Sequence, residues 1–196
     1  MTDWDKRWRE GETPWEKGEP APPLLELLAN AEESELIRGA SGFVPGCGSG
    51  HDVRALASAG ARVLGLDLSP YAVEKARSHA PVNHERYAEG DLFKWSGEVY
   101  DFAWEHTCFC AIDPSCRDDY GESMGRLIRT GGVLFGVFYL NPWDPGEKAE
   151  GPPFGVTKEE IIKHLKPWFS LNWGKQPSQA YPGREGREWL ASFQRL

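Results

Sequence analysis

The chain has 196 residues and a net charge of −8, with 40% hydrophobic and 27% charged residues. This length suits one domain, so we expect residues 1–196 to form a single domain. The negative charge disfavours nucleic acid as a partner, because neutralising phosphates takes clustered Lys and Arg. The longest apolar run, Val133–Leu140, is too short to cross a membrane. A small molecule is therefore the predicted partner, and the sequence gives no signal for an oligomeric state.

The first residues, Met1–Asp5, are acidic and aromatic and lack the basic and apolar regions of a secretory signal. We therefore expect a cytoplasmic protein with reduced thiols. The chain has four cysteines, Cys47, Cys108, Cys110 and Cys116. They show neither a CxxC pair nor the His spacing of a zinc site, so no metal is predicted.

Residues 1–23 are dense in Trp, Pro, Gly and charge, which predicts an N-terminal arm without one regular element along it. A short helix should follow Pro22–Pro23, since proline is tolerated in the first turn. Strands and helices then alternate. The predicted strands are 42–44, 62–66, 84–88, 100–105, 133–140, 168–175 and 189–194, and the Pro- and Gly-rich residues 141–155 form a long loop.

The helices between these strands have recognisable starts. Ser69-Pro70 and Asp113-Pro114 each pair an N-cap with a first-turn proline, and Thr157–Glu160 fits a capping box. We expect the helix after Asp113 to run to Gly131-Gly132. The alternation predicts an α/β fold with an open, doubly wound, mostly parallel sheet, in which ligands bind outside the carboxyl ends of the strands.

The predicted ligand loop follows the first of these strands. Gly46, Gly48 and Gly50 lie between strand and helix, where absent side chains let the backbone turn tightly and approach a ligand. An ordinary tight turn is the simpler alternative. A dinucleotide fingerprint would read GxGxxG, but His51 stands three residues after Gly48.

Two carboxylates sharpen this interpretation. Asp67 ends the second strand, where it could accept hydrogen bonds from both ribose hydroxyls of an adenosine. Asp91 follows the third strand, near where an adenine amino group would lie. The alternative is that Asp67 caps a turn and Asp91 is solvated.

The tryptophans favour a methyl donor over a nicotinamide. S-adenosylmethionine carries a sulfonium cation, and aromatic faces attract cations, Trp most strongly. Three of the nine tryptophans, Trp4, Trp8 and Trp15, lie in the first fifteen residues and would form a lid within residues 1–23. Plain aromatic packing of the arm is the alternative.

Several motifs together resemble the thiopurine methyltransferase superfamily, and most closely its halide and thiol methyltransferase branch. They extend along nearly the whole chain: Trp4-Asp5-Lys6-Arg7-Trp8, Thr13-Pro14-Trp15, Val44-Pro45-Gly46-Cys47-Gly48-Ser49-Gly50-His51-Asp52, Gly65-Leu66-Asp67-Leu68-Ser69 and Phe109-Cys110-Ala111-Ile112-Asp113-Pro114. The resemblance implies a seven-stranded class I (Rossmann-like) methyltransferase fold, S-adenosylmethionine as donor and S-adenosylhomocysteine as product. The cofactor contacts expected by this match are Trp4, Trp8, Trp15, Gly46, Gly48, Gly50, Asp67, Asp91, Leu92 and Glu105.

One segment departs from the branch. Plant halide methyltransferases have Asp-Tyr-Val-Phe-Phe-Cys where this chain has Glu105-His106-Thr107-Cys108-Phe109-Cys110. The segment ends the fourth strand and should face the transferred methyl group. We therefore expect His106 and Cys108 to be catalytic and Phe109 to contact the acceptor, with a structural histidine at the strand end as the alternative for His106. Arg184 could pair with an anionic acceptor, the alternative being a solvated loop before the last strand.

The predicted reaction is methyl transfer to a small soft nucleophile: a thiol, bisulfide or halide. A soft anion needs only positioning and desolvation, whereas a neutral thiol would benefit from a base, for which His106 is the candidate. Cys108 and Cys110, at i and i+2, would share one face of a strand and could bind tellurite or arsenite. A thiopurine is another alternative acceptor, and a nicotinamide-dependent oxidoreductase and a non-catalytic cofactor-binding module are competing functions.

Overall fold

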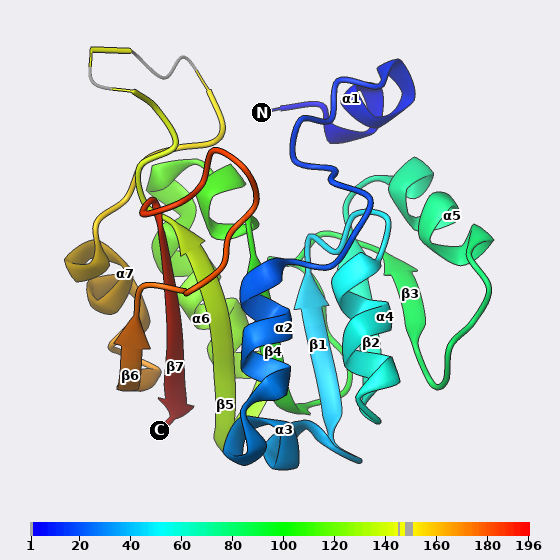
Figure 1. Ribbon diagram of the computed structural model, residues 1–196, viewed down its shortest axis with the longest axis vertical. Helices are drawn as coiled ribbons and strands as arrows, with labels where there is room; N and C mark the ends of the chain where they lie inside the picture. The colour runs from blue at the N-terminus through cyan, green and yellow to red at the C-terminus, as the bar shows by residue number, and fades with distance from the viewer. Residues whose placement is uncertain (1, 145, 148–150) are drawn as a thin grey trace.

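A computed structural model describes residues 2–144, 146–147 and 151–196, which form one sheet flanked by helices (Figure 1). The strands are β1 Ser41–Pro45, β2 Arg62–Asp67, β3 Arg86–Glu89, β4 Tyr100–His106, β5 Ile128–Tyr139, β6 Phe169–Lys175 and β7 Glu188–Arg195. The helices are α1 Trp4–Glu10, α2 Pro22–Ala29, α3 Ala31–Ile37, α4 His51–Ser58, α5 Pro70–Ser78, α6 Arg117–Leu127 and α7 Lys158–Leu165, with two 3₁₀ turns at Phe109–Ala111 and Pro114–Cys116.

The seven strands are ordered β3-β2-β1-β4-β5-β7-β6. β1 to β5 pair in parallel, and β7 runs antiparallel to both β5 and β6. The chain winds outward in one direction from β1 through β3 and in the other from β4. The carboxyl ends of β1 and β4 therefore meet at the switch point, where such sheets bind their ligands.

Each face of the sheet is covered by its own set of helices. On one face, Leu24 and Leu27 of α2, Ile37 of α3 and two residues of α4, Val53 and Leu56, pack on the strands. On the other, side chains of α6 and α7 complete a second core; they are Tyr120, Met124, Leu127, Ile161 and Leu165. Figure 1 shows α1 and the chain that follows it above the carboxyl ends of the strands.

Most predicted elements are confirmed, and so are two helix caps. Ser69 Oγ accepts from the Ala72 amide at 3.1 Å, and Thr157 and Glu160 form the complete capping box. The predicted helix after Asp113 was too long, because α6 ends at Leu127 and β5 begins at Ile128, which pairs with Tyr100 of β4. Pairing of a β-branched residue to a neighbouring strand prevails over helical spacing here.

The arm contains a helix that irregular Trp spacing did not predict. α1 begins after Asp3, whose side chain accepts from the Lys6 amide at 2.9 Å, and ends at Gly11 in the left-handed region. α3 was likewise not predicted. Among the residues that the structure describes, no helix is long and apolar enough to cross a membrane.

Candidate active site

The glycine loop after β1 needs residues without side chains. Gly46, Gly48 and Gly50 have φ of 59°, 53° and 78°, a region that other residues rarely adopt. The surroundings are also close, because a Cβ at Gly50 would lie 2.6 Å from the Tyr87 ring and one at Gly48 would lie 3.1 Å from the Trp8 ring. The loop is thus a backbone surface with Trp8 packed directly on it.

Asp67 connects this loop to the end of β2. Its Oδ2 accepts from the Gly48 amide at 2.8 Å and its Oδ1 from the Ser69 amide at 2.9 Å. Burial raises the pKa of this carboxyl although these amides stabilise its charge. Asp67, which the sequence predicts to bind the ribose, therefore also holds the glycine loop in place.

Glu16 attaches the arm to the same loop. Its Oε1 lies 2.9 Å from His51 Nε2 and accepts from the Gly18 amide at 2.9 Å, while its Oε2 accepts from the Ser49 hydroxyl. Burial raises the pKa of Glu16, but these hydrogen bonds and the charge of His51 outweigh burial and lower the pKa to about 2. The arm is thus held by an ionised carboxylate.

A second contact holds α1 on α5. Asp5 Oδ1 accepts from the Ser69 hydroxyl at 2.8 Å and from the Tyr71 amide at 3.0 Å. The first turn of a helix carries free amides, so a carboxylate from another segment satisfies them there. The arm is therefore attached to the glycine loop through Glu16 and to the start of α5 through Asp5.

The three arm tryptophans do cluster. Trp15 makes edge contacts with Trp4 and Trp8, at ring-centroid distances of 5.4 and 6.1 Å. The Arg7 guanidinium lies 4.5 Å from the Trp15 centroid, and Lys75 Nζ lies 5.4 Å from that of Trp8. Cationic side chains thus already stack on faces of this cluster, as expected for electron-rich rings.

His106, the last residue of β4, is held by Asp52 in the first turn of α4. Its Nδ1 lies 2.8 Å from Asp52 Oδ2, which also accepts from Trp104 Nε1 at 2.8 Å, while Asp52 Oδ1 accepts from the Ala21 amide at 2.7 Å. Burial raises the pKa of Asp52, but the contact with His106 and the hydrogen bonds from Ala21 and Trp104 lower it overall.

Two residues that precede β7 complete the surroundings of His106. The Tyr181 ring stacks on the imidazole at 6.0 Å and 25°, and Arg184 Nη1 lies 3.4 Å from His106 Nε2. Arg184 also lies 3.3 Å from Glu188 and 4.7 Å from the Tyr139 ring centroid. The structure thus brings together His106 and Arg184, which are 78 residues apart in the sequence.

Thr107, next to His106, has strained backbone. Its φ is 61°, the only positive value at a non-glycine residue in the described part of the chain. A β-branched residue rarely adopts this conformation, and such strain concentrates at functional sites. Thr107 follows the last residue of β4, and its conformation turns the next residues away from the strand direction.

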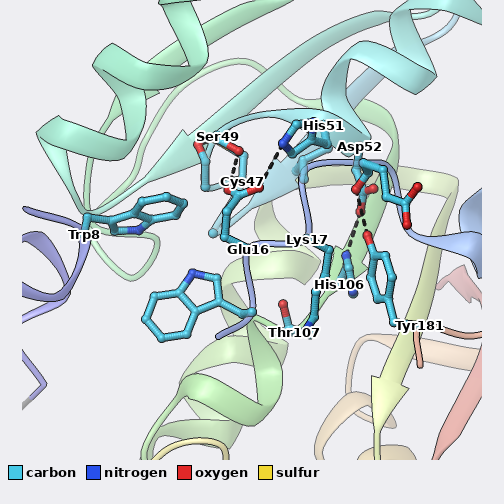
Figure 2. A pocket seen from close by; sticks show the side chains of 15 residues that line it. Trp8, Glu16, Lys17, Cys47, Ser49, His51, Asp52, His106, Thr107 and Tyr181 are labelled. Carbon is cyan, nitrogen blue, oxygen red and sulfur yellow. Dashed lines mark hydrogen bonds and ion pairs between the residues drawn. The ribbon is translucent and has the colours of Figure 1, made fainter. Parts of the chain in front are cut away.

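One pocket lies where these parts meet (Figure 2). Among the predicted residues it is lined by Trp8, Trp15, Gly46, Gly48 and His106. Its other lining residues are Glu16, Lys17, Glu19, Val44, Cys47, Ser49, His51, Asp52, Thr107 and Tyr181. It therefore contains the glycine loop, the arm and the end of β4.

Other predicted site residues lie outside this pocket. Asp91 accepts from the Phe93 amide at 3.0 Å and pairs with Lys94, and Leu92 packs on the α6 side of the sheet. Glu105 points away from His106 into that core, where it accepts from the Phe109 amide at 2.8 Å and the Tyr120 hydroxyl at 2.5 Å. Phe109 is 1% exposed and packs on Tyr120 and Phe138. Trp4, Gly50, Asp67, Cys108 and Arg184 also do not line the pocket.

The expectation that Cys108 and Cys110 share a strand face is wrong. β4 ends at His106, and Phe109–Ala111 form a 3₁₀ turn that follows the strained Thr107. Burial raises the pKa of the Cys108 thiol well above its usual value and that of Cys110 to about 12. These thiols are therefore protonated and poor metalloid ligands as they stand.

Sequence reasoning missed Asp52, Glu16 and Tyr181. Asp52 had the clearest signal, because a carboxylate in the first turn after a glycine loop stands beside whatever the loop binds. Glu16 and Tyr181 had none, since their contacts depend on how the arm and the loop before β7 fold back.

Comparison with known proteins places this site in a family. The family model described as "Thiopurine S-methyltransferase (TPMT)" matches residues 1–189. The chain belongs to the thiopurine S-methyltransferase family. Like the rest of this family it is an enzyme that uses S-adenosylmethionine as methyl donor, so the predicted donor is confirmed.

Relatives in the thiopurine S-methyltransferase family include both plant and bacterial enzymes. "Probable thiol methyltransferase 2" of Arabidopsis thaliana is 36% identical over 169 residues, which is 84% of this chain and 71% of that protein. "Thiocyanate methyltransferase 1" of the same plant is 32% identical over 98% of this chain and 84% of its own length. "Thiopurine S-methyltransferase" of Pseudomonas fluorescens is 31% identical, covering 87% and 82%.

Solved structures confirm the predicted class I methyltransferase fold. The Burkholderia thailandensis 1,6-didemethyltoxoflavin-N1-methyltransferase, solved with bound S-adenosylhomocysteine, superposes with a TM-score of 0.75 over 99% of this chain and 86% of that one, at 19% identity. A protein that converts a disulfide bond into a thioacetal group during echinomycin biosynthesis gives 0.76 over 98% and 90%, at 22% identity. At these identities the likeness concerns the fold.

Proposed function

We propose that this enzyme methylates a small soft nucleophile, such as a thiol, bisulfide or halide, at the pocket between the glycine loop and His106. The observation that carries the proposal is the composition of that pocket: a glycine-rich loop, two tryptophans and the end of β4 at the switch point of the sheet. The names of the relatives, thiol, thiocyanate and thiopurine methyltransferases, support this class of acceptor.

The residues of the pocket fit S-adenosylmethionine. Gly46 and Gly48 have positive φ and let Cys108 and the Trp8 ring approach the loop backbone closely, and the same lack of side chains suits the approach of a cofactor to that backbone. Trp8 and Trp15, with the ionised Glu16, provide the aromatic and negative surroundings that stabilise a cation. When bound, the cofactor supplies a methyl group on a sulfonium, which a nucleophile displaces in line.

The chain's own residues contribute position and exclusion of water. The arm, fastened by Asp5 and Glu16, covers the glycine loop and brings Trp8 within contact of Gly48. A closed, dry pocket strengthens electrostatic interactions and holds the reactants in line. We propose residues 1–23 as the lid of a single-domain enzyme, and the cytoplasmic location stays a prediction of the sequence.

The adenosine side of the site is also a proposal. Asp67 would meet the ribose while it holds Gly48, and Asp91 with Leu92 would flank the adenine beyond the end of β3. Trp4, Gly50 and Glu105 would act indirectly, Trp4 by packing on Trp15, Gly50 by admitting the Tyr87 ring and Glu105 by holding the Phe109 amide. On the acceptor side, Cys108 would support the glycine loop at Gly46, and Phe109 would act from the core on the α6 side of the sheet.

Two measurements test the proposal. Quenching of tryptophan fluorescence by S-adenosylhomocysteine, with NADH as the control ligand, tests the cofactor side. Incubation with labelled S-adenosylmethionine and iodide, bisulfide, thiophenol, tellurite or 6-mercaptopurine, followed by detection of methylated products, tests the acceptor. Methylation of the soft nucleophiles is expected. Cofactor binding without any product would instead support a non-catalytic module.

A further inference from the structure

His106 has a different partner at each ring nitrogen, Asp52 at Nδ1 and Arg184 at Nε2. Arginine has only N–H donors, so a neutral imidazole satisfies both partners when Nε2 accepts from Arg184, which lies at 3.4 Å. The proton of a neutral imidazole then lies on Nδ1 and is donated to Asp52 at 2.8 Å. His106 therefore offers an unprotonated Nε2, and the Arg184 contact is long enough that a better donor can displace it.

The charges around the pocket disfavour a free anion. Its two carboxylates with little exposure, Glu16 and Asp52, have side chains that are 16% and 11% exposed and are paired with His51 and His106. Glu19 adds a further carboxylate, and Lys17, which is exposed, is the only Lys or Arg among the lining residues. Arg184 faces Glu188, so its charge is already paired. No unpaired cationic side chain among these residues except Lys17 would therefore offset the cost of removing an iodide or thiocyanate ion from water.

A neutral acceptor meets no such penalty. From these two observations we propose that the acceptor is a neutral thiol, deprotonated in the pocket by His106 Nε2, with Asp52 as the residue that positions His106. The inference rests on the proposed methyltransferase function and narrows its acceptor class to thiols that carry a proton.

The proton and electron pairs balance. The S–H bond breaks, its proton bonds to Nε2, and its electron pair stays on the thiol sulfur. That sulfur bonds to the methyl carbon, and the pair of the broken carbon–sulfonium bond goes to the sulfur of S-adenosylhomocysteine. The imidazolium, stabilised by Asp52, then releases its proton to water. No oxidant or reductant is needed.

The groups around His106 come from several elements. Asp52 approaches from α4, Tyr181 and Arg184 from the loop before β7, and Glu188 from β7 itself. Figure 2 shows His106 next to Asp52 and beside Tyr181. Glu105 is the neighbour on β4, with its carboxylate on the opposite face of the strand. Asp52, which contacts the imidazole Nδ1 directly, is the partner that would stabilise a protonated His106.

The test compares ethanethiol with iodide as acceptors, because ethanethiol carries a proton at neutral pH and iodide never does. Volatile products are measured by headspace gas chromatography. The intact enzyme should prefer ethanethiol. In His106→Asn the amide nitrogen can still donate to Asp52, but the base is gone, so kcat/KM for ethanethiol near neutral pH should fall by about 100-fold. The loss should shrink above the thiol's own pKa, and the fall for iodide should be much smaller.

A matched control lies outside the pocket. His84 is an exposed histidine before β3 that does not line the pocket, so His84→Asn should leave both activities unchanged. Asp52→Asn can keep a carbonyl oxygen toward His106 Nδ1 and Trp104 Nε1, but it removes the negative charge that stabilises a protonated imidazole. It should lower kcat for ethanethiol more than it changes KM, with the same recovery at high pH. His106→Asn serves alone if Asp52→Asn does not fold.

The outcomes distinguish a wrong acceptor class, a wrong role for His106 and a wrong proposed function. An intact enzyme that methylates iodide as well as ethanethiol overturns the acceptor class. Equal ethanethiol rates for His106→Asn and the intact enzyme, or a loss that is the same at every pH, overturn the base. If the intact enzyme binds S-adenosylhomocysteine but methylates neither probe, the proposed function itself falls, and this inference with it.

Discussion

Glu16 is the residue on which docking of the arm most depends. Its carboxylate contacts His51, Ser49 and the Gly18 amide, so it joins the arm to the glycine loop and to the start of α4. Replacing it with Gln preserves its size and one carbonyl acceptor but removes the charge. We expect Glu16→Gln to loosen the arm, including Trp8 and Trp15.

The size of the effect follows from the pKa. Hydrogen bonds from His51, Ser49 and Gly18 overcome burial and lower the pKa of Glu16 from 4.5 to about 2. One pKa unit corresponds to about 1.4 kcal/mol, so the ionised group contributes at most about 3 kcal/mol. This contribution is present above pH 4.5 and is lost as the pH falls toward 2. Because Gln keeps some of the hydrogen bonds, we expect a loss of about 1–2 kcal/mol near neutral pH.

Limited proteolysis measures this loss. Lys17 is exposed beside Glu16, so trypsin can cleave after it once the arm opens. A loss of about 1–2 kcal/mol raises the open fraction by about 5- to 30-fold, and cleavage should accelerate by the same factor when opening is fast. Affinity for S-adenosylhomocysteine should fall as well, because the open arm removes Trp8 and Trp15 from the pocket.

Glu12→Gln is the matched control. Glu12 is an exposed carboxylate of the same arm, with no side-chain hydrogen bond among the described residues, so its cleavage rate should equal that of the original chain. If Glu16→Gln is cleaved no faster than Glu12→Gln, the carboxylate does not hold the arm and the reasoning from its pKa is refuted.

Three further predictions concern buried groups. Asp67→Ala should weaken S-adenosylhomocysteine binding at least about tenfold in calorimetry, because the Gly48 and Ser69 amides lose their acceptor; unchanged affinity would reject its role in the cofactor site. Glu105→Gln should match or exceed the original stability in urea by about 1 kcal/mol. Burial raises the pKa of Glu105, so stability is lost as the pH rises through that pKa, and a neutral amide avoids the loss; a markedly less stable variant would contradict this. A thiol reagent at neutral pH should label Cys47, Cys108 and Cys110 much faster after denaturation than before it, because burial raises the pKa of those three thiols; equal rates before and after would be inconsistent with it.

Local signals in the sequence were enough for most of the sheet and its helices. Alternation of apolar segments located the strands, and the caps at Ser69 and Thr157 located two helix starts, because both depend on residues a few positions apart. The predicted boundary between α6 and β5 was wrong because it does not depend on residues a few positions apart. It is set by pairing of Ile128 with Tyr100, which lies 28 residues earlier in the chain and cannot be read from helical spacing.

The sequence by itself determined the glycine loop, the order of strands and helices and the class of donor. These follow from residues adjacent along the chain, from the positive φ that only glycine adopts easily, and from motifs that resemble one family. Only the tertiary structure shows which residues surround His106 and hold the arm. Asp52 meets His106 across 54 residues, and Glu16 meets Ser49 across 33. Hydrogen bonds between residues so far apart in the sequence form only in the packed fold, so a pattern of neighbouring residues cannot predict them.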